Sequence, residues 1–412
     1  MQPMWLEKCR VIGNKTIEIS GSKSISNRLL ILQYLFGNIK TENLSNSQDT
    51  AVLQQALATT ADVIDVHHAG TAMRFLTAYF AIQEGRSVTL TGSPRMQERP
   101  VKSLVDALLH LGADIQYLKN DGYPPLKITG KKLRKSNVTI PADISSQFIT
   151  ALLLIGAKLD NGITITLDGE ITSRPYLEMT LKILRSLEIE YTFEDNIIRV
   201  FPDHEESRGL RSAPFIIESD WSSASYYYSL AALSGENINL RCFKPYSLQG
   251  DSVLREIYWK YFGVNTISDG AAAKISLYPE TNHEQPDKIV LHMNDCPDIA
   301  QTLCVTAAAK KIHFELTGLS TLRIKETNRL LALHQELKKI GCMTEISDDR
   351  IASTNFFPPE REISIATYND HRMAMSFAPF ALITGLTIEN PEVVEKSYPA
   401  FWEDFALLTE KY

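Results

Sequence analysis

The apolar and polar positions of the chain repeat one pattern. A helix rich in small and apolar residues is followed by a glycine turn, a short alternating strand, a polar loop and an amphipathic helix. The pattern predicts first helices at 28–36, 73–83, 147–158, 224–233, 299–310 and 373–383. It predicts strands after four of them, where β-branched residues gather, at 87–90, 163–166, 238–240 and 313–316. Glycines mark the turns that follow five of the helices: Gly37, Gly85, Gly162, Gly235 and Gly385.

The spacing of these glycines gives the period of the repeat. Gly85, Gly162 and Gly235 are separated by 77 and 73 residues, and the next turn glycine follows 150 residues later, which is two periods. Gly37 precedes Gly85 by only 48 residues, so the first copy is short. A period near 75 is too long for the common solenoids. We therefore expect an α/β fold of six βαβαββ-type repeats, the first truncated, in two sets of three with a boundary near 214–218.

Composition and charge narrow the class of protein. Apolar residues make up 44% of the 412-residue chain, enough for two or three cores. Lys and Arg number 42 against 49 Asp and Glu, a net charge of −7, which argues against nucleic acid or an anionic membrane as partner. No apolar run reaches the roughly 18 residues of a membrane span, and the first ten residues lack the pattern of a signal peptide. We therefore expect a cytoplasmic protein.

The cysteines and histidines do not predict a metal site. The nine histidines show no ligand spacing, and His371 is expected to be a structural hydrogen-bonding residue rather than a base. The five cysteines lack Cys-x-x-Cys spacing, which is typical of reduced thiols: Cys9, Cys242, Cys296, Cys304 and Cys342. A zinc site is therefore not expected.

The strongest chemical signal lies at residues 21–28, GSKSISNR. Lys23 and Arg28 lie five residues apart among hydroxyls, directly before an apolar helix, and Ser and Asn are common helix N-caps. Backbone N–H groups at a helix start, hydroxyls and cations can together bind an anion. The segment is not a nucleotide P-loop, because Ser22 stands where that motif needs glycine. An ordinary capped helix with solvated charges remains the alternative.

Further segments place polar groups at loops or helix starts of the repeat. Each has a plain structural alternative: Gly70 could shape a turn, Asp298 could cap the helix after it, and the arginines of 94–100 could be solvated. The densest charge lies at 323–329, where three cations surround Glu326 and need compensating anions. These segments are 68–74, 94–100, 145–147, 296–298, 323–329 and 369–373.

Cations recur at corresponding loops in both halves of the chain. In an acidic protein, such loops can gather polyanionic small molecules through their local field. The sequence therefore predicts an anion-binding site between two domains, built on these side chains: Lys23, Arg28, Arg95, Lys325, Arg329, Arg372 and Lys396.

Taken together, the motifs resemble the 5-enolpyruvylshikimate-3-phosphate synthase family. They occur in family order from residue 21 to residue 397: GSKSISNR, AGTAMR, PRMQERP, SSQF, RPY, the aspartate of Cys-Pro-Asp, RIKETNR, NDHRMAM and a final Glu-Lys-Ser. The resemblance implies a two-domain inside-out α/β barrel, with domains 21–217 and 1–20 plus 218–412 and the active site in the interdomain cleft. It implies transfer of the enolpyruvyl group of phosphoenolpyruvate to the 5-hydroxyl of shikimate 3-phosphate, through a tetrahedral adduct, without metal or organic cofactor.

The resemblance also implies roles for individual residues. Asp298 would act at the reacting hydroxyl, Glu326 would donate a proton to the methylene, and Lys23 would bridge both substrates. The implied phosphoenolpyruvate site comprises Lys23, Gly70, Arg95, Gln147, Arg329, Arg372 and Lys396. The implied shikimate 3-phosphate site comprises Lys23, Ser24, Arg28, Ser145, Ser146, Gln147, Ser173, Tyr176, Asp298 and Lys325. Two small-molecule substrates, no nucleic-acid or membrane partner, a monomer and glyphosate as an inhibitor are the corresponding expectations.

The sequence departs from the family pattern at three places. The first copy lacks the strand pair before AGTAMR, His68 and Phe75 replace a common Asn and Pro, and Thr321 stands where many relatives have Asn. Two alternatives remain: the sister transferase acting on UDP-N-acetylglucosamine, and a non-catalytic homologue. The loop cysteine of the sister family has no counterpart between Cys9 and Cys242, and the retained charged residues argue against a non-catalytic protein.

Overall fold

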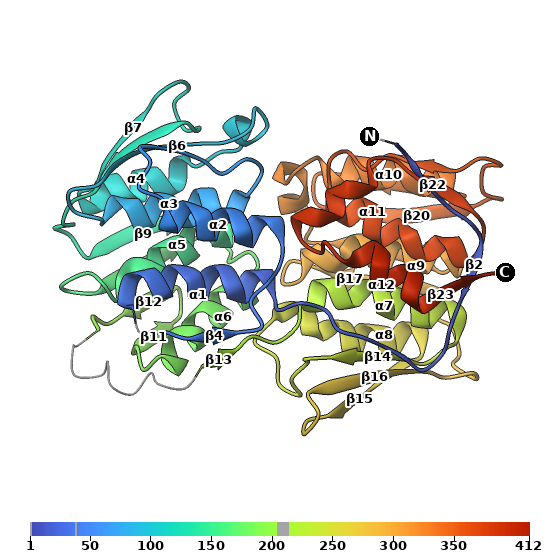
Figure 1. Cartoon of the computed structure of the whole chain (residues 1–412). Coiled ribbons are helices and arrows are strands. Elements are labelled where there is room, and N and C mark those ends of the chain that lie inside the picture. Colours follow the sequence, from blue (N-terminus) through green and yellow to red (C-terminus); the bar gives the residue numbers. More distant parts are fainter. Residues whose placement is uncertain (1, 38, 204–213) are drawn as a thin grey trace. The chain divides into compact units, whose positions relative to one another are not determined.

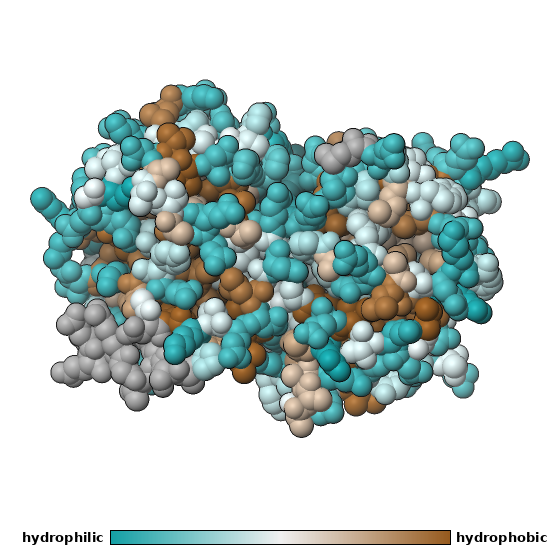
Figure 2. Space-filling view, viewed as in Figure 1, coloured by the Kyte–Doolittle hydropathy of each residue, from teal (hydrophilic) through white to brown (hydrophobic). Residues whose placement is uncertain are grey.

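The chain divides into two units in the computed structural model, which describes residues 2–37, 39–203 and 214–412 (Figure 1). The amino-terminal unit is Ser22–Ile217, and the carboxyl-terminal unit combines Met1–Gly21 with Glu218–Tyr412. Hydrophilic residues cover much of the face shown for each unit (Figure 2). Among the described residues, no helix has both the length and the apolar character needed to cross a membrane.

The amino-terminal unit contains two complete copies of the repeat and one reduced copy. Its first elements are α1 (Lys23–Phe36), β4 (Thr41–Glu42), α2 (Gln48–Ala58), β5 (Val63–Asp65), α3 (Gly70–Ala81), β6 (Ser87–Thr91), η1 (Met96–Glu98), α4 (Lys102–Leu111), β7 (Asp114–Tyr117) and β8 (Leu126–Thr129). Its remaining elements are β9 (Asn137–Pro141), α5 (Ser146–Gly156), β10 (Ile163–Asp168), α6 (Arg174–Ser186), β11 (Tyr191–Glu194), β12 (Ile197–Val200) and β13 (Phe215–Ile216).

The strand order shows how one copy is built. In the sheet β5-β6-β8-β7, the first two strands are parallel and are joined through α3, and the hairpin of β7 and β8 adds antiparallel strands. The sheet β9-β10-β12-β11 has the same order and directions. Among the residues that the structure describes, the reduced copy has the parallel pair β4 and β13 and no hairpin. The predicted truncation of the first repeat is therefore confirmed.

The carboxyl-terminal unit repeats this arrangement with strands from both ends of the chain. Its first elements are β1 (Met4–Leu6), β2 (Cys9–Val11), β3 (Lys15–Ile17), α7 (Trp221–Ser234), β14 (Ile238–Arg241), η3 (Gly250–Val253), α8 (Leu254–Phe262), β15 (Val264–Asp269) and β16 (Lys274–Pro279). Next come β17 (Lys288–His292), η4 (Pro297–Ile299), α9 (Ala300–Ala309), β18 (His313–Thr317), η5 (Ser320–Ile324), α10 (Arg329–Lys339), β19 (Cys342–Ile346) and β20 (Ile351–Phe356). The last are β21 (Ser364–Ile365), α11 (His371–Phe377), η6 (Ala378–Leu382), β22 (Leu386–Ile388), η7 (Pro391–Lys396), α12 (Phe401–Leu408) and β23 (Thr409–Lys411).

Residues before Gly21 complete three of its sheets. β3 lies parallel to β14 in the sheet β3-β14-β16-β15, and β1 and β2 lie antiparallel to β22 and β23. The sheet β17-β18-β20-β19 comes wholly from the later part of the chain.

The first helix of each copy lies in the interior of its unit. In α5 every residue from Phe148 to Gly156 is buried, whereas α4 buries only one face. A helix that is apolar around its circumference must be enclosed, and α1, α3 and α5 indeed contact one another (Figure 1). In the carboxyl-terminal unit, hydroxyls join the inner helices: Thr302 Oγ1 of α9 lies 3.0 Å from Ser225 Oγ of α7 and 3.1 Å from Ser376 Oγ of α11. The loops that precede these helices are thereby brought together.

The predicted inner helices are present with shifted bounds, and the shifts are largest for α1 and α11. The helix α1 begins at Lys23, so residues 23–28 form its first turns rather than a loop, with Ser22 at the N-cap. The helix α11 ends at Phe377 and the chain continues as η6, because Pro379 has no backbone N–H to donate to a further α-helical turn.

The turn glycines act in two ways. The four glycines at 37, 85, 162 and 235 have positive φ, between 64° and 80°, which side chains other than glycine rarely adopt. Gly385 instead permits a close contact, because a Cβ there would lie 2.6 Å from Cζ2 of Trp5.

Candidate active site

Lys23 is held by a carboxylate of the same unit. Its ammonium lies at the first residue of α1, 3.2 Å from Oδ2 of Asp49, which is buried near the start of α2. Sequence reasoning missed Asp49, because its partner lies 26 residues away and no local pattern reveals the pairing. This ion pair with Asp49 orients the side chain of Lys23, which is a predicted catalytic residue.

Arg28 is buried and its donors go to protein acceptors. Nε donates to Thr180 Oγ1 at 2.8 Å, Nη1 to the carbonyl of Ser24 at 2.7 Å, and Nη2 to Thr150 Oγ1 and the carbonyl of Tyr176 at 3.4 and 3.3 Å. Burial lowers the pKa of Arg28 to about 10. Arg28 therefore connects α1 to α5 and α6 through hydrogen bonds. A direct contact between Arg28 and substrate stays a prediction.

Hydroxyl and amide groups of the implied shikimate 3-phosphate site lie at the starts of α5 and α6. Ser145 Oγ caps α5 by accepting from the backbone N–H of Gln147 at 3.3 Å, and Ser146 is the first residue of that helix. The Gln147 amide donates to Thr71 Oγ1 of α3 at 3.4 Å. Ser173 precedes α6 with φ +56°, a left-handed conformation that is unfavourable for a residue with a Cβ. These helix starts supply backbone N–H groups suited to an anion.

The loop 94–100 presents Arg99 rather than Arg95 beside Gly70. A Cβ on Gly70 would lie 2.6 Å from Nη1 of Arg99 and 2.9 Å from Nη1 of Arg74, so a side chain there would displace these two guanidinium groups. Arg99 is buried, whereas the side chain of Arg95 is 44% exposed and forms an ion pair with Glu98 at 3.0 Å. The family resemblance assigns Arg95 to the phosphoenolpyruvate site, and that assignment stays a prediction.

The carboxyl-terminal unit gathers the remaining predicted residues into one cluster. Arg329 Nη1 lies 3.0 Å from Asp298 Oδ1, and its Nη2 lies 2.9 Å from Glu326 Oε2. Arg372 Nη1 donates to the backbone carbonyl of Asp298 at 2.9 Å, and Arg372 Nη2 lies 3.1 Å from Asp298 Oδ2. Lys396 Nζ lies 2.7 Å from Glu326 Oε1. Each of the two predicted catalytic carboxylates is therefore held by Arg329 and by at least one further cation.

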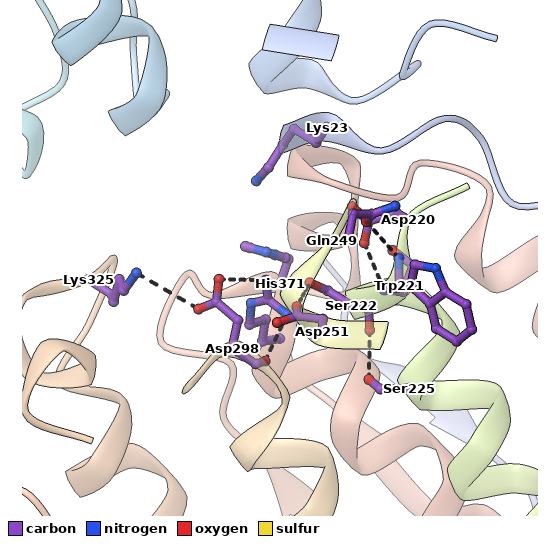
Figure 3. A network of polar contacts seen from close by, with 12 residues as sticks. Lys23, Asp220, Trp221, Ser222, Ser225, Gln249, Asp251, Asp298, Lys325 and His371 are labelled. Carbon is purple, nitrogen blue, oxygen red and sulfur yellow. Dashed lines mark hydrogen bonds and ion pairs between the residues drawn. The ribbon is translucent and has the colours of Figure 1, made fainter. Parts of the chain in front are cut away.

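Asp370 and Lys325 complete the cluster. Asp370 is fully buried, lies 2.6 Å from Nε of Arg329, and caps α11 by accepting from the backbone N–H of Arg372 at 2.9 Å. Lys325 points toward Asp298, 3.8 Å from its Oδ1 (Figure 3). Sequence reasoning quoted Asp370 only as part of a motif. Its role as an anchor depends on a partner 41 residues away, which no local pattern reveals.

The cations of this cluster set the protonation state of Asp298. Burial alone would raise its pKa, but Arg372, Lys325 and Arg329 outweigh burial and hold the pKa below the ordinary value. Burial likewise disfavours the charge on Arg329, yet Asp370, Glu326 and Asp298 raise its pKa. Asp298 is thus an anion at neutral pH, placed to accept a hydrogen bond or proton.

The three departures from the family pattern have structural consequences. In place of the missing strand pair, α2 is followed directly by β5. Phe75 is buried inside α3, which begins at Gly70. His68 Nδ1 lies 2.9 Å from Ser93 Oγ. Within the described residues, the buried Oγ1 of Thr321 has no hydrogen-bond partner, so its contact with substrate stays a prediction.

No cluster of three or more His, Cys, Asp or Glu side chains is placed to hold a metal ion in the part of the chain that the structure describes. All five cysteines are free thiols, and four of them are buried. Burial raises the pKa of Cys9 to about 11, which keeps that thiol protonated.

Solved structures show the class of protein to which this fold belongs. EPSP synthase from Acinetobacter baumannii is similar with a TM-score of 0.73 and 21% identity, covering 100% of this chain and 99% of that one. The enolpyruvyl transferase NikO from Streptomyces tendae is similar with a TM-score of 0.67 and 15% identity, covering 99% and 98%. The fold is that of the enolpyruvyl transferases, as the sequence predicted.

Sequence comparison shows the family. The EPSP synthase (3-phosphoshikimate 1-carboxyvinyltransferase) family model matches residues 36–405. The 3-phosphoshikimate 1-carboxyvinyltransferase of Bacteroides fragilis strain YCH46 is 43% identical over 395 residues, 94% of each chain. That of Shewanella denitrificans strain OS217 is 34% identical over 445 residues, covering 100% of both. This chain belongs to the EPSP synthase family of enzymes, so the predicted family is confirmed over its sister family.

Proposed function

We propose that the chain transfers the enolpyruvyl group of phosphoenolpyruvate to the 5-hydroxyl of shikimate 3-phosphate and releases phosphate. The observation that carries the proposal is the cluster in which Asp298 and Glu326 share Arg329 and are each bound by a second cation. Together with membership of the family, this provides a base, an acid and positive charge for two anionic substrates. The reaction leads toward chorismate and the aromatic amino acids; a cytoplasmic location and a monomer stay predictions.

The reaction needs one proton to leave the hydroxyl and another to reach the enol methylene. Asp298, kept ionised by its cations, takes the hydroxyl proton as that oxygen bonds to C2 of phosphoenolpyruvate. Glu326 gives a proton to C3, which completes the tetrahedral adduct. The bond from C2 to the phosphate oxygen then breaks with its electron pair, a methyl proton returns to Glu326, and the hydroxyl proton goes to the departing phosphate. Lys23 stabilises that phosphate as it leaves.

Glu326 must carry a proton to act as the acid, although Arg329 and Lys396 bind its carboxylate at 2.9 and 2.7 Å. The carboxylate and phosphate of phosphoenolpyruvate compete for the same two cations. Their competition weakens the two ion pairs that hold the Glu326 carboxylate. Binding of phosphoenolpyruvate therefore draws Arg329 and Lys396 away from Glu326, so that Glu326 can act as the acid.

Residues of both units would contribute to substrate binding, as the family resemblance implies. The geometry adds Arg99 to the predicted phosphoenolpyruvate residues, because its guanidinium lies at Gly70 and at the start of α3. A planar guanidinium can bind carboxylate or phosphate through two parallel hydrogen bonds.

The activity is tested by incubating the purified protein with phosphoenolpyruvate and shikimate 3-phosphate and measuring released phosphate. Release should require both substrates, and NMR should show a new enol ether on the shikimate ring. Phosphate release without shikimate 3-phosphate would indicate hydrolysis, and no release would reject the proposal.

A pair of substitutions separates the two arginines of the loop. Arg99→Lys should raise the KM for phosphoenolpyruvate on the order of 10-fold, because an ammonium cannot reproduce the bidentate contact, while Arg95→Lys should change it less. Steady-state kinetics with shikimate 3-phosphate in excess gives both values. A larger effect at Arg95 would restore the assignment made from the sequence.

A further inference from the structure

Asp251 is a buried carboxyl group for which the catalytic steps above have no use. It lies in η3, only 2% exposed. Its Oδ2 accepts a hydrogen bond from the hydroxyl of Ser222, at the start of α7 (Figure 3). Its Oδ1 is buried and has no hydrogen-bond partner among the residues the structure describes.

This set of contacts suits a neutral acid better than an anion. An ionised carboxylate has about four sites that can accept a hydrogen bond. Burying it without donors for these sites lowers the stability of the fold. Asp370 in the same unit shows the contrast: it accepts from two nitrogens of the Arg329 guanidinium and from the backbone of Arg372. Asp251 has one hydroxyl donor where Asp370 has three charged or backbone donors.

The charged groups around Asp251 come from several elements. Asp298 of η4, Asp220 before α7 and Arg372 of α11 all act on it electrostatically. Burial first, and then the negative charge of Asp298, raise the pKa of Asp251 to about 7, while Arg372 and the Ser222 hydroxyl act in the opposite direction.

Two further titratable groups border this region. Cys296, just before η4, is buried, and burial together with Asp251 raises the pKa of its thiol. Arg255 of α8 donates to the carbonyls of Ser252 and Pro245 and lies over the Trp221 ring. These contacts of its guanidinium are with groups other than the carboxyl group of Asp251.

We propose that Asp251 is a positioning residue that works as a neutral acid: while protonated, it leaves Arg372 to Asp298 and to the anionic substrate, and when ionised it competes for that guanidinium. The inference rests on the proposed function. Arg372 Nη2 lies 3.1 Å from Asp298 Oδ2 and its Nη1 donates to the Asp298 carbonyl at 2.9 Å. A second negative charge close by would pull Arg372 away from this position and repel phosphoenolpyruvate.

The test is the pH profile of kcat/KM for phosphoenolpyruvate. In the parent protein it should fall about tenfold or more between pH 6.5 and pH 8.5, as Asp251 ionises. Asp251→Asn, which cannot ionise, should remove this alkaline fall while changing the value at pH 6.5 far less. Ser222→Ala removes a hydrogen bond that lowers the pKa of Asp251, so it should move the fall to higher pH.

Asp404→Asn provides a matched control. Asp404 is a half-buried carboxyl on α12 with one hydroxyl donor, Tyr398 at 2.6 Å, and burial raises its pKa as well. Its replacement should leave the alkaline fall unchanged. An alkaline fall that persists unaltered in both Asp251→Asn and Ser222→Ala would overturn the proposal; if Asp251→Asn fails to fold, the Ser222→Ala profile decides.

A second measurement does not depend on substrate. The infrared carbonyl band of a protonated carboxyl should be present in the parent protein at pH 6, titrate away toward pH 8.5, and be reduced in Asp251→Asn relative to Asp404→Asn. An unchanged band in Asp251→Asn would show that Asp251 is ionised and would reject the proposal. Absence of phosphate release by the parent protein at every pH would instead reject the proposed function.

Discussion

Arg329→Met should lower the free energy of unfolding of the carboxyl-terminal unit by about 3–5 kcal/mol at pH 7. The guanidinium is buried and lies within 3.0 Å of three carboxylates, those of Asp298, Glu326 and Asp370. Removing it leaves buried negative charges without their shared partner. Enzymatic activity should be lost as well, because the same guanidinium is proposed to bind phosphoenolpyruvate.

The sign of the pH dependence follows from Asp298. Its pKa is depressed in the folded protein, so its stabilising contribution is complete above the unfolded value of about 4 and is lost as the pH falls below it. The destabilisation by Arg329→Met should therefore be largest at neutral pH and smaller in acid. Urea unfolding followed by tryptophan fluorescence reports on this unit alone, because all four tryptophans belong to it: Trp5, Trp221, Trp259 and Trp402.

Arg323→Met is the control for this measurement. Arg323 forms an ion pair with Asp348 at 2.6 Å, but both side chains are exposed, so its loss should cost no more than about 1 kcal/mol. Equal destabilisation by the two substitutions would contradict the view that the buried cluster is held by Arg329.

Glu326→Gln should lower kcat on the order of 100-fold or more while shikimate 3-phosphate still binds. An amide cannot donate the proton that the methylene requires, yet it keeps the shape of the side chain. Glu315→Gln is the matched control, because Glu315 also lies between two cations, Lys288 and Arg350, each at 2.7 Å, on the strand β18. Turnover by Glu326→Gln within a few-fold of the parent would show that another group is the acid.

The repeat could be predicted from the sequence because its signals are local. Turn glycines, small-residue helices and alternating strands lie within one period, and the two complete sheets of the amino-terminal unit follow that order. The end of α11 could have been predicted too, since Pro379 was visible within the expected helix. The periodicity of apolar residues was given more weight than the missing N–H.

The candidate site was predictable only as a set of charged residues, not as pairs. Lys23 and Asp49 are 26 positions apart, and Arg329 and Asp370 are 41 apart, so their pairing depends on how helices pack. The burial of Asp251 is equally invisible, because a lone acid after glycine normally lies in a solvated turn. In the loop 94–100 the sequence shows two arginines, but the direction of each side chain is a property of the folded backbone.

The strands β1, β2 and β3 also bear on the order in which a ribosome-bound chain can fold. These residues are made before their partners, because β3 pairs with β14, and β1 and β2 pair with β22 and β23. The unit Ser22–Ile217 has all its own strands once residue 217 is synthesised, so it can fold during translation. The strands β1 and β2 must wait unpaired until β22 and β23 have been made, and a chain stopped before β22 would leave both without partners.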